Sequence, residues 1–206
     1  MYINCHTYYS LRYGTIKPER LLAIASENGL QTLALTDINN TSACLDFVRL
    51  SSKYKIKPVL GVDFRNGVQQ QFIVIAKNNQ GFQEINSYLS KFLHDQNLKI
   101  PEKPEVPFHN CYVIYPYEHE KQYHLKANEF LGIKPKDLNK LQFSKWSIHR
   151  KKLVVLQTVS FENKKGFNTH RLLRAIDNNT LLSKLPQSEQ GEETDVMLPY
   201  NELRVA

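Results

Sequence analysis

The chain has 206 residues, a length that suits one domain with a sizeable core. Hydrophobic residues make up 41% of it and Gly and Pro are few, which favours a packed globular protein over a disordered or fibrous one. It has neither an apolar run long enough to cross a bilayer nor a secretory signal pattern, so we expect a cytoplasmic protein without a membrane partner.

Cysteine usage indicates a reducing environment. Cys5, Cys44 and Cys111 are odd in number and widely spaced, which fits buried thiols better than a disulfide framework. No Cys-x-x-Cys pair is present, so a zinc ribbon is excluded.

The net charge of +7 is concentrated in one stretch. Thirteen Lys or Arg lie between Lys121 and Arg174 against three acidic residues, an excess of ten positive charges. Such asymmetry is typical of proteins that work near a polyanion, and Lys151 and Lys152 are the candidates to face DNA. The alternative is an ordinary solvated basic surface.

Strands and helices alternate in the first half of the chain. The patterns predict strands at 2–6, 32–36, 59–64 and 71–76, and helices at 18–28, 42–54 and 80–93. A strand–helix–strand series calls for a parallel sheet with right-handed crossovers.

The second half is less regular. Three prolines make 95–108 a surface excursion, and the patterns then predict strands at 111–115 and 153–159, short helices at 136–141 and 144–150, and a helix at 169–182. The tail 187–206 leads away from this domain. About six strands fit an open α/β sheet or an incomplete (β/α) barrel, and periodicity does not choose between them.

Three of these strands end in polar residues. His6, Asp37 and Asp63 close successive strands, so a parallel sheet places them on one rim, as a metal site requires. Each also has a structural interpretation: His6 as a hydrogen-bonded residue at a strand end, Asp37 as a cap toward Thr41 and Ser42, and Asp63 as the partner of a rim Lys or Arg.

The same segments resemble a known family. Four of them, in the expected order, are similar to the PHP (polymerase and histidinol phosphatase) domain at the N-terminus of bacterial DNA polymerase III alpha subunits: 4–11, 34–39, 56–63 and 75–82. The resemblance implies a distorted (β/α)7-type barrel with a metal cleft at the C-terminal strand ends. It also implies that 1–206 is a single PHP domain, the N-terminal part of a much longer polymerase.

The metal ligands of that family are incomplete in this chain. Asn4 and Ile38 stand where the family has His, Asp63 where it has Glu, and Thr158 and Ser160 where a late motif has Asp and His. Three remaining candidates, His6, Asp37 and Asp63, cannot hold a multinuclear centre, although one weakly bound Zn or Mn ion is the alternative. We therefore expect no catalytic residue and no cofactor in this domain.

Two functions stay open. The first is a non-catalytic scaffold that supports the polymerase and, as in some relatives, docks the proofreading exonuclease subunit. The full-length protein would then be a Mg-dependent DNA-directed DNA polymerase, a nucleotidyltransferase that contacts DNA. The second is a metal-dependent phosphoesterase of the PHP superfamily.

The cluster Glu118-His119-Glu120 is the densest set of potential metal donors outside the three strand ends, and we expect it to be solvated.

Overall fold

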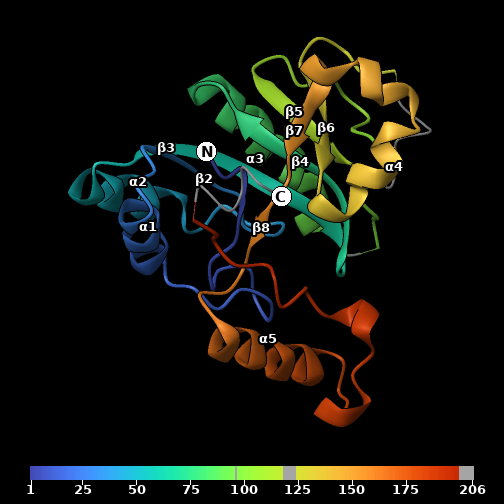
Figure 1. The fold of residues 1–206 in the computed structure, drawn as a ribbon. Coiled ribbons are helices and arrows are strands. Elements are labelled where there is room, and N and C mark those ends of the chain that lie inside the picture. The colour runs from blue at the N-terminus through green and yellow to red at the C-terminus, as the bar shows by residue number, and fades with distance from the viewer. Residues whose placement is uncertain (96, 118–123, 200–206) are drawn as a thin grey trace.

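The computed structural model describes residues 1–95, 97–117 and 124–199, and it is a mixed α/β fold (Figure 1). The strands are β1 Asn4–Cys5, β2 Thr32–Leu35, β3 Lys57–Asn66, β4 Gln69–Ala76, β5 Cys111–Pro116, β6 Glu129–Ile133, β7 Leu153–Val155 and β8 Thr158–Val159. The α-helices are α1 Pro18–Glu27, α2 Cys44–Ser51, α3 Asn79–His94, α4 Leu138–Gln142 and α5 Lys164–Asp177. Short 3-10 helices lie at Ser52–Tyr54, Pro135–Asp137, Lys145–Ile148, Arg150–Lys152, Leu182–Lys184 and Gln187–Glu189.

Six strands form a curled sheet in the order β2-β3-β4-β5-β6-β7, and β1 pairs with β8. All neighbours are parallel except β4, which is antiparallel to both β3 and β5. Asn66 pairs with Gln69, so β3 and β4 form a hairpin with a two-residue turn whose first residue is Gly67, at a φ of 60°. Such turns favour glycine because its backbone enters the left-handed region without strain.

Hydrogen bonds outside the regular ladders close the strands into a distorted barrel. The amides of Ala34 and Thr36 donate to the carbonyls of Tyr2 and Cys5, which joins β1 to β2. At the other edge, β7 and β8 are consecutive parts of one segment: β7 pairs with β6, and β8 pairs with β1. Residues 153–159 therefore connect the two edges of the sheet, and the sequence-based expectation of a PHP-type barrel is confirmed.

The interior of the barrel has an apolar layer. Buried side chains from β2, β4 and β5 meet there, together with Ile3 and Leu156, and partly buried ones from β3, β6 and β7 pack against them. Alternate residues of the same strands face outward, as the period of two in a β-strand requires. For example, Ile73 and Ile75 point inward while Phe72 and Val74 belong to an outer cluster.

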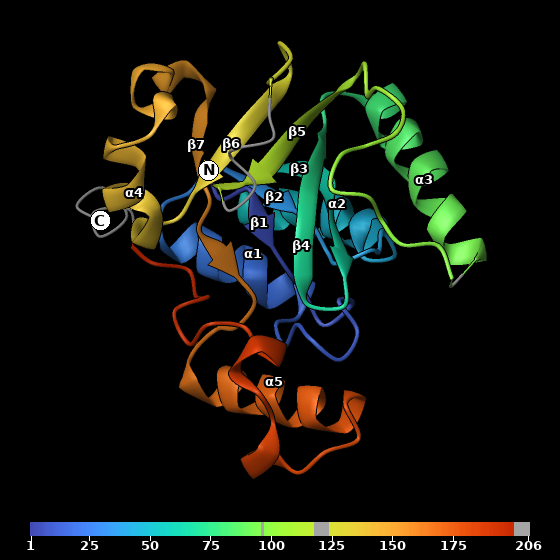
Figure 2. The ribbon, with the colours of Figure 1, turned by 90° about the vertical axis from the view of Figure 1, so that its right-hand side faces the viewer.

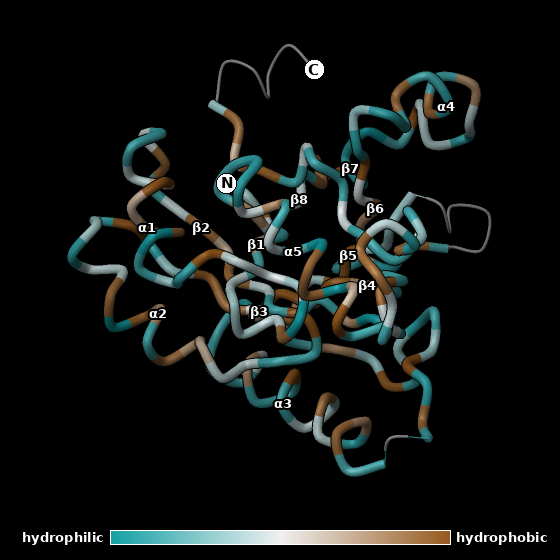
Figure 3. Tube along the Cα trace, turned by 90° about the horizontal axis from the view of Figure 1, so that it is seen from below, coloured by the Kyte–Doolittle hydropathy of each residue, from teal (hydrophilic) through white to brown (hydrophobic). Residues whose placement is uncertain are grey.

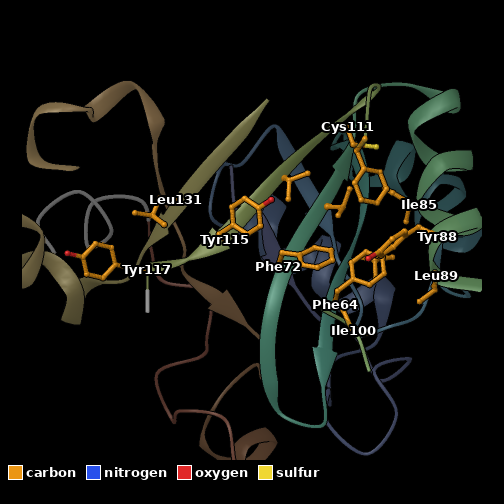
Figure 4. Close-up of a cluster of buried hydrophobic side chains, with 14 of the residues drawn as sticks. Phe64, Phe72, Ile85, Tyr88, Leu89, Ile100, Cys111, Tyr115, Tyr117 and Leu131 are labelled. Carbon is orange, nitrogen blue, oxygen red and sulfur yellow. The ribbon is translucent and has the colours of Figure 1, made fainter. Parts of the chain in front are cut away.

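Helices α1, α2 and α3 cover the outside of the strands, whereas α5 lies beyond one end of them (Figures 2 and 3). α1 and α2 pack on β2 through Leu21, Leu22 and Phe47. α3 packs on the β3–β4 hairpin, where Tyr88 meets the rings of Phe64 and Phe72 at centroid distances of 5.5 and 6.3 Å (Figure 4). These outer clusters hold the barrel strands in position around the interior.

The described part of the excursion 95–108 contains no helix or strand, as expected, but Ile100 and Phe108 anchor it in the outer core. No helix among the described residues is both long and apolar enough to cross a membrane.

The parallel pairing expected of the strand–helix–strand series is found between β2 and β3. β4 follows without a helix and is antiparallel, because the β3–β4 turn is too short for the crossover that parallel strands need. The strand β6 was not predicted. The expected helix 169–182 begins at Lys164 and ends at Asp177, because the Asn163 side chain accepts hydrogen bonds from the amides of Lys165 and Gly166 at its start.

Closure of the barrel by residues 153–159 predicts that substitutions at two neighbouring positions lower the free energy of unfolding by different amounts. Leu156 is 1% exposed in the barrel interior, whereas Val155 is 57% exposed. We expect Leu156→Ala to lower the free energy of unfolding by about 2–5 kcal/mol. Val155→Ala should change it by about 0.5 kcal/mol or less. Urea unfolding of both variants measures this, and equal costs would contradict the closure of the barrel by residues 153–159.

Candidate functional site

A polar layer lies above the apolar layer, at the C-terminal ends of the parallel strands. Its members are all less than 9% exposed, and they come from β1, β2, β3 and β8 and the residues just after them: Asn4, His6, Thr36, Asp37, Asp63, Arg65, Thr158 and Ser160. All three sequence-predicted metal ligands therefore lie at this end of the barrel. Buried polar groups are costly unless they are hydrogen-bonded, so their partners determine what the layer does.

Asp63 is the centre of this layer. Its Oδ2 atom accepts hydrogen bonds from His6 Nε2 at 3.0 Å, Arg65 Nε at 2.9 Å and Gln70 Nε2 at 2.8 Å. Its Oδ1 atom has no hydrogen-bond partner among the described residues. Burial alone would raise the pKa of Asp63, but the charge of Arg65 and the hydrogen bond from His6 outweigh it, so the pKa lies below its ordinary value.

Arg65 supplies the positive charge that this carboxylate needs. It follows Asp63 by two residues on β3, so both side chains point into the barrel. Its Nη2 lies 2.7 Å from Asp63 Oδ2, and its guanidinium carbon lies 4.9 Å from the centre of the Tyr13 ring. Burial acts to lower the pKa of Arg65, but the charge of Asp63, the Tyr13 phenol and the hydrogen bonds to both together outweigh it, so the pKa is raised. Arg65 is thus a permanently charged cation inside the barrel.

Thr158 and Ser160 also belong to this layer. Thr158 is paired with Asn4 in the β1–β8 register, and Asn4 Nδ2 donates to Thr158 Oγ1 at 3.0 Å. Ser160 Oγ lies 2.8 Å from His6 Nδ1. Asn4 and Thr158 therefore satisfy each other, and both ring nitrogens of His6 have partners inside the protein.

Asp37 holds the loop that follows β1 through hydrogen bonds. Its carboxylate accepts hydrogen bonds from the Thr7 amide at 2.6 Å, Thr7 Oγ1 at 2.8 Å and Ser10 Oγ at 2.7 Å. The expected cap toward Thr41 and Ser42 is wrong, because the loop 7–10 lies closer to the end of β2. The expected ion pair of Asp63 with a rim cation is confirmed by Arg65.

The donors of this layer do not fit the metal centre that the family resemblance implies. Every nitrogen of the His6 ring and both oxygens of Asp37 are already hydrogen-bonded to the chain, which leaves Asp63 Oδ1 as the one unpartnered oxygen of the three candidates. Within the described residues, no group of three or more His, Cys, Asp or Glu side chains has a metal-binding arrangement. A cation placed here would also meet the guanidinium of Arg65, which repels it. Whether the site binds one ion weakly stays a prediction.

A cavity of about 980 Å³ opens above the polar layer. Its wall includes Tyr13, Arg65, Gln70 and Thr158, together with lysines after β6 and acidic residues of the tail, but none of His6, Asp37 and Asp63. A molecule in this cavity would therefore contact a guanidinium and a phenol ring and would be separated from the three candidate ligands.

His170 connects three segments beside this cavity, a role that sequence reasoning missed. Its Nδ1 donates to the Tyr13 carbonyl at 2.7 Å, and its Nε2 accepts from the Gly191 amide at 2.8 Å. The ring is neutral, because burial and, to a smaller extent, the charges of Arg174 and Arg65 lower the pKa of His170 to about 4, against the hydrogen bond to the Tyr13 carbonyl, which acts to raise it. α5, the loop after β1 and the tail are thus joined through one imidazole.

The cysteines have no catalytic environment. All three are free and buried. Burial raises the pKa of Cys44 and of Cys111 to about 12, and it raises that of Cys5 strongly as well. Buried thiols with raised pKa values are structural rather than nucleophilic.

The basic stretch is partly used by the fold. Lys152 Nζ donates to the backbone carbonyls of Ala127 and Glu129, whereas Lys151 is exposed. Contact of either residue with DNA stays a prediction. The cluster Glu118-His119-Glu120 lies outside the described residues.

Sequence and structure comparisons identify what the chain is similar to. The family model described as "PHP domain" matches residues 3–132. A DNA polymerase III subunit alpha of Staphylococcus aureus is 25% identical over 191 residues, which is 91% of this chain and 18% of that protein. The subunit alpha of Mycoplasma genitalium is 31% identical over 91 residues, 42% of this chain and 10% of that protein.

One solved structure, described as a metal-dependent phosphoesterase from Bifidobacterium adolescentis, has a TM-score of 0.41 and 12% identity, with 98% of this chain and 93% of that chain covered. The chain spans between a tenth and a fifth of the length of the curated relatives it matches.

The ion pair between Asp63 and Arg65 predicts that substitutions of its two members have non-additive effects on the free energy of unfolding. Arg65→Met leaves a buried carboxylate without its counter-charge, and we expect a loss of about 3–5 kcal/mol in the free energy of unfolding. Asp63→Asn removes the charge that Arg65 neutralises. The double variant should be more stable than the sum of the single effects predicts, by about 1–3 kcal/mol. Urea unfolding of the four proteins measures the coupling, and additive effects would contradict the role of Arg65.

His170 predicts a pH dependence of stability. The pKa of about 4 in the folded protein lies below the ordinary value of 6.5, so the unfolded chain binds a proton that the folded one excludes. The contribution of His170 is complete above pH 6.5 and is lost as the pH falls toward 4, with a slope of about 1 kcal/mol per pH unit. Carboxylates with lowered pKa values, such as that of Asp63, change the free energy of unfolding at lower pH than His170 does.

The variant His170→Asn keeps a donor for the Tyr13 carbonyl but does not titrate. We expect its free energy of unfolding to change less between pH 7 and pH 5 than that of the wild type. Denaturant unfolding at both pH values tests this, and equal changes in the two proteins would show that His170 is not the responsible group.

Proposed function

Because the chain belongs to the PHP domain family, we propose that it is a non-catalytic PHP domain that serves as a structural scaffold. One observation carries this proposal. At the position where the family resemblance implies metal ions, Arg65 pairs with Asp63 and forms part of the cavity wall. A guanidinium neutralises a carboxylate but cannot activate water or polarise a phosphate as a metal ion does.

The relatives found by sequence suggest which larger protein the scaffold belongs to. Those matched by sequence carry the name DNA polymerase III subunit alpha, and the match with the Staphylococcus aureus protein extends over 191 residues. We propose that the chain is the PHP part of such a subunit, whose DNA polymerase activity, Mg requirement and contact with DNA reside elsewhere in the protein. The remainder of the alpha subunit is then the first partner, and a proofreading exonuclease subunit is the second.

The scaffold and the phosphoesterase hypotheses predict opposite results in an activity assay. We expect no hydrolysis above background of p-nitrophenyl phosphate, its diester or 3′-labelled DNA when the protein is supplied with Zn²⁺, Mn²⁺ or Mg²⁺, because the ligand set is too small. Addition of EDTA or Zn²⁺ should leave the melting temperature unchanged, since no bound metal stabilises the fold. Hydrolysis by the wild type that disappears in the variant Asp63→Asn would reject the scaffold hypothesis.

A rebuilt site provides the control for this assay. Asn4→His, Ile38→His, Thr158→Asp and Ser160→His together restore the family pattern, and the set is made with and without Arg65→Ala. Calorimetric titration with Zn²⁺ should show tighter binding when Arg65 is absent, because the internal cation is then removed. Equal affinities in the two folded proteins would mean that Arg65 does not stand in for the metal charge.

A further inference from the structure

A second concave surface lies at the opposite end of the barrel. It is a groove of about 740 Å³ at the N-terminal ends of the parallel strands, and we call it the lower groove. Its lining comprises Met1, Ile3, Val48, Lys57, Pro58, Val59, Leu60, Ile75, Ala76, Lys77, Asn78, Asn79, Phe82, Tyr112, Ile114, Phe130 and Val154. It shares no residue with the cavity above the polar layer.

The floor of the lower groove is the apolar layer of the barrel interior. Ile3, Ile75 and Ile114 are buried members of that layer, and Phe130 and Val154 are partly buried ones. The barrel interior therefore reaches the surface here. At the mouth, Tyr112 is 44% exposed and Met1 is 58% exposed. Apolar surface in a concave site is a common feature of binding surfaces, because burying it releases hydration water.

The rim of the lower groove is positively charged. Lys57 and Lys77 line it, and none of its lining residues is Asp or Glu. Lys77 Nζ lies 4.6 Å from the centre of the Tyr112 ring, which holds the ammonium at the edge of the apolar floor. Lys152 is not a lining residue, but its Nζ lies 5.3 Å from the centre of the Phe130 ring while it donates to backbone carbonyls. Neither Lys57 nor Lys77 forms an ion pair with the residues that the structure describes.

We propose that the lower groove binds an acidic peptide segment of another protein. An aromatic or aliphatic side chain of that segment enters the apolar floor, and neighbouring carboxylates pair with Lys57 and Lys77. The combination fits a peptide better than other anions: the aliphatic residues and Phe130 of the floor offer no hydrogen-bonding groups for the edge of a nucleotide base. A lipid surface does not follow a concave groove. Because the groove and the Arg65 site occupy opposite ends of the barrel, this proposal does not rest on the absence of catalysis.

A peptide library displayed on phage, selected against the full chain, tests the proposal. We expect the enriched peptides to contain Asp or Glu beside a bulky apolar residue. A fluorescein-labelled peptide from the selection should bind in an anisotropy titration, and its affinity should fall as salt is added. Replacement of its acidic residues by Asn or of its apolar residue by Ala should weaken binding.

Variants of the chain locate the binding site. Lys77→Glu should weaken binding of the same peptide by about tenfold or more, since it reverses a charge at the contact. Tyr112→Ser, at an exposed ring, tests the apolar contribution. Lys184→Glu is the matched control, because this exposed lysine lies outside the lower groove, and it should leave affinity within about twofold of the wild type.

Unfolding curves establish that each variant is folded before binding is compared. Failure to enrich any peptide, enrichment of basic or neutral peptides, or equal losses in Lys77→Glu and Lys184→Glu would each overturn the proposal. Preferential loss in Lys77→Glu and Tyr112→Ser supports it.

Discussion

The ion pair between Asp63 and Arg65 is the interaction on which the upper half of the barrel depends. A carboxylate that is 0% exposed is costly without a counter-charge, and Arg65 provides one from the same strand. His6 and Gln70 donate to the same oxygen, so β1, β3 and β4 are joined at this point. The charge of the buried carboxylate is thereby neutralised by the chain itself.

This arrangement retains the barrel frame without the donors of a metal centre. Polar side chains still meet where the parallel strands end, but they satisfy one another: Asn4 binds Thr158, and His6 binds Ser160. A network in which most members have partners stabilises one structure and leaves few donors for an ion. The two ends of the barrel differ in chemistry.

The two ends offer different surfaces. Above the polar layer, the cavity wall carries both signs of charge, because lysines after β6 face acidic residues of the tail. At the other end, the lower groove is apolar with a basic rim. In (β/α) barrels the N-terminal end usually contributes stability rather than binding. Here the uncovered apolar layer gives that end the features of a binding surface.

Most helices and strands, and three members of the polar layer, follow from the sequence. Local periodicity and turn residues predicted the strands up to β5 and the first three helices, and strand-end positions identified His6 and Asp63, which the structure brings within 3.0 Å. Alternation along β3 also carries the signal that Arg65 shares a face with Asp63, although its role was not recognised.

Tertiary structure decided the rest. Barrel closure depends on hydrogen bonds between residues 154 positions apart, such as Asn4 and Thr158, and a local pattern contains no information on such pairs. The short strand β6 and the antiparallel direction of β4 likewise depend on their neighbours. Which partner satisfies a buried charge is set by the three-dimensional packing, and for that reason the sequence alone does not show that Arg65, His6 and Gln70 all bind the carboxylate of Asp63.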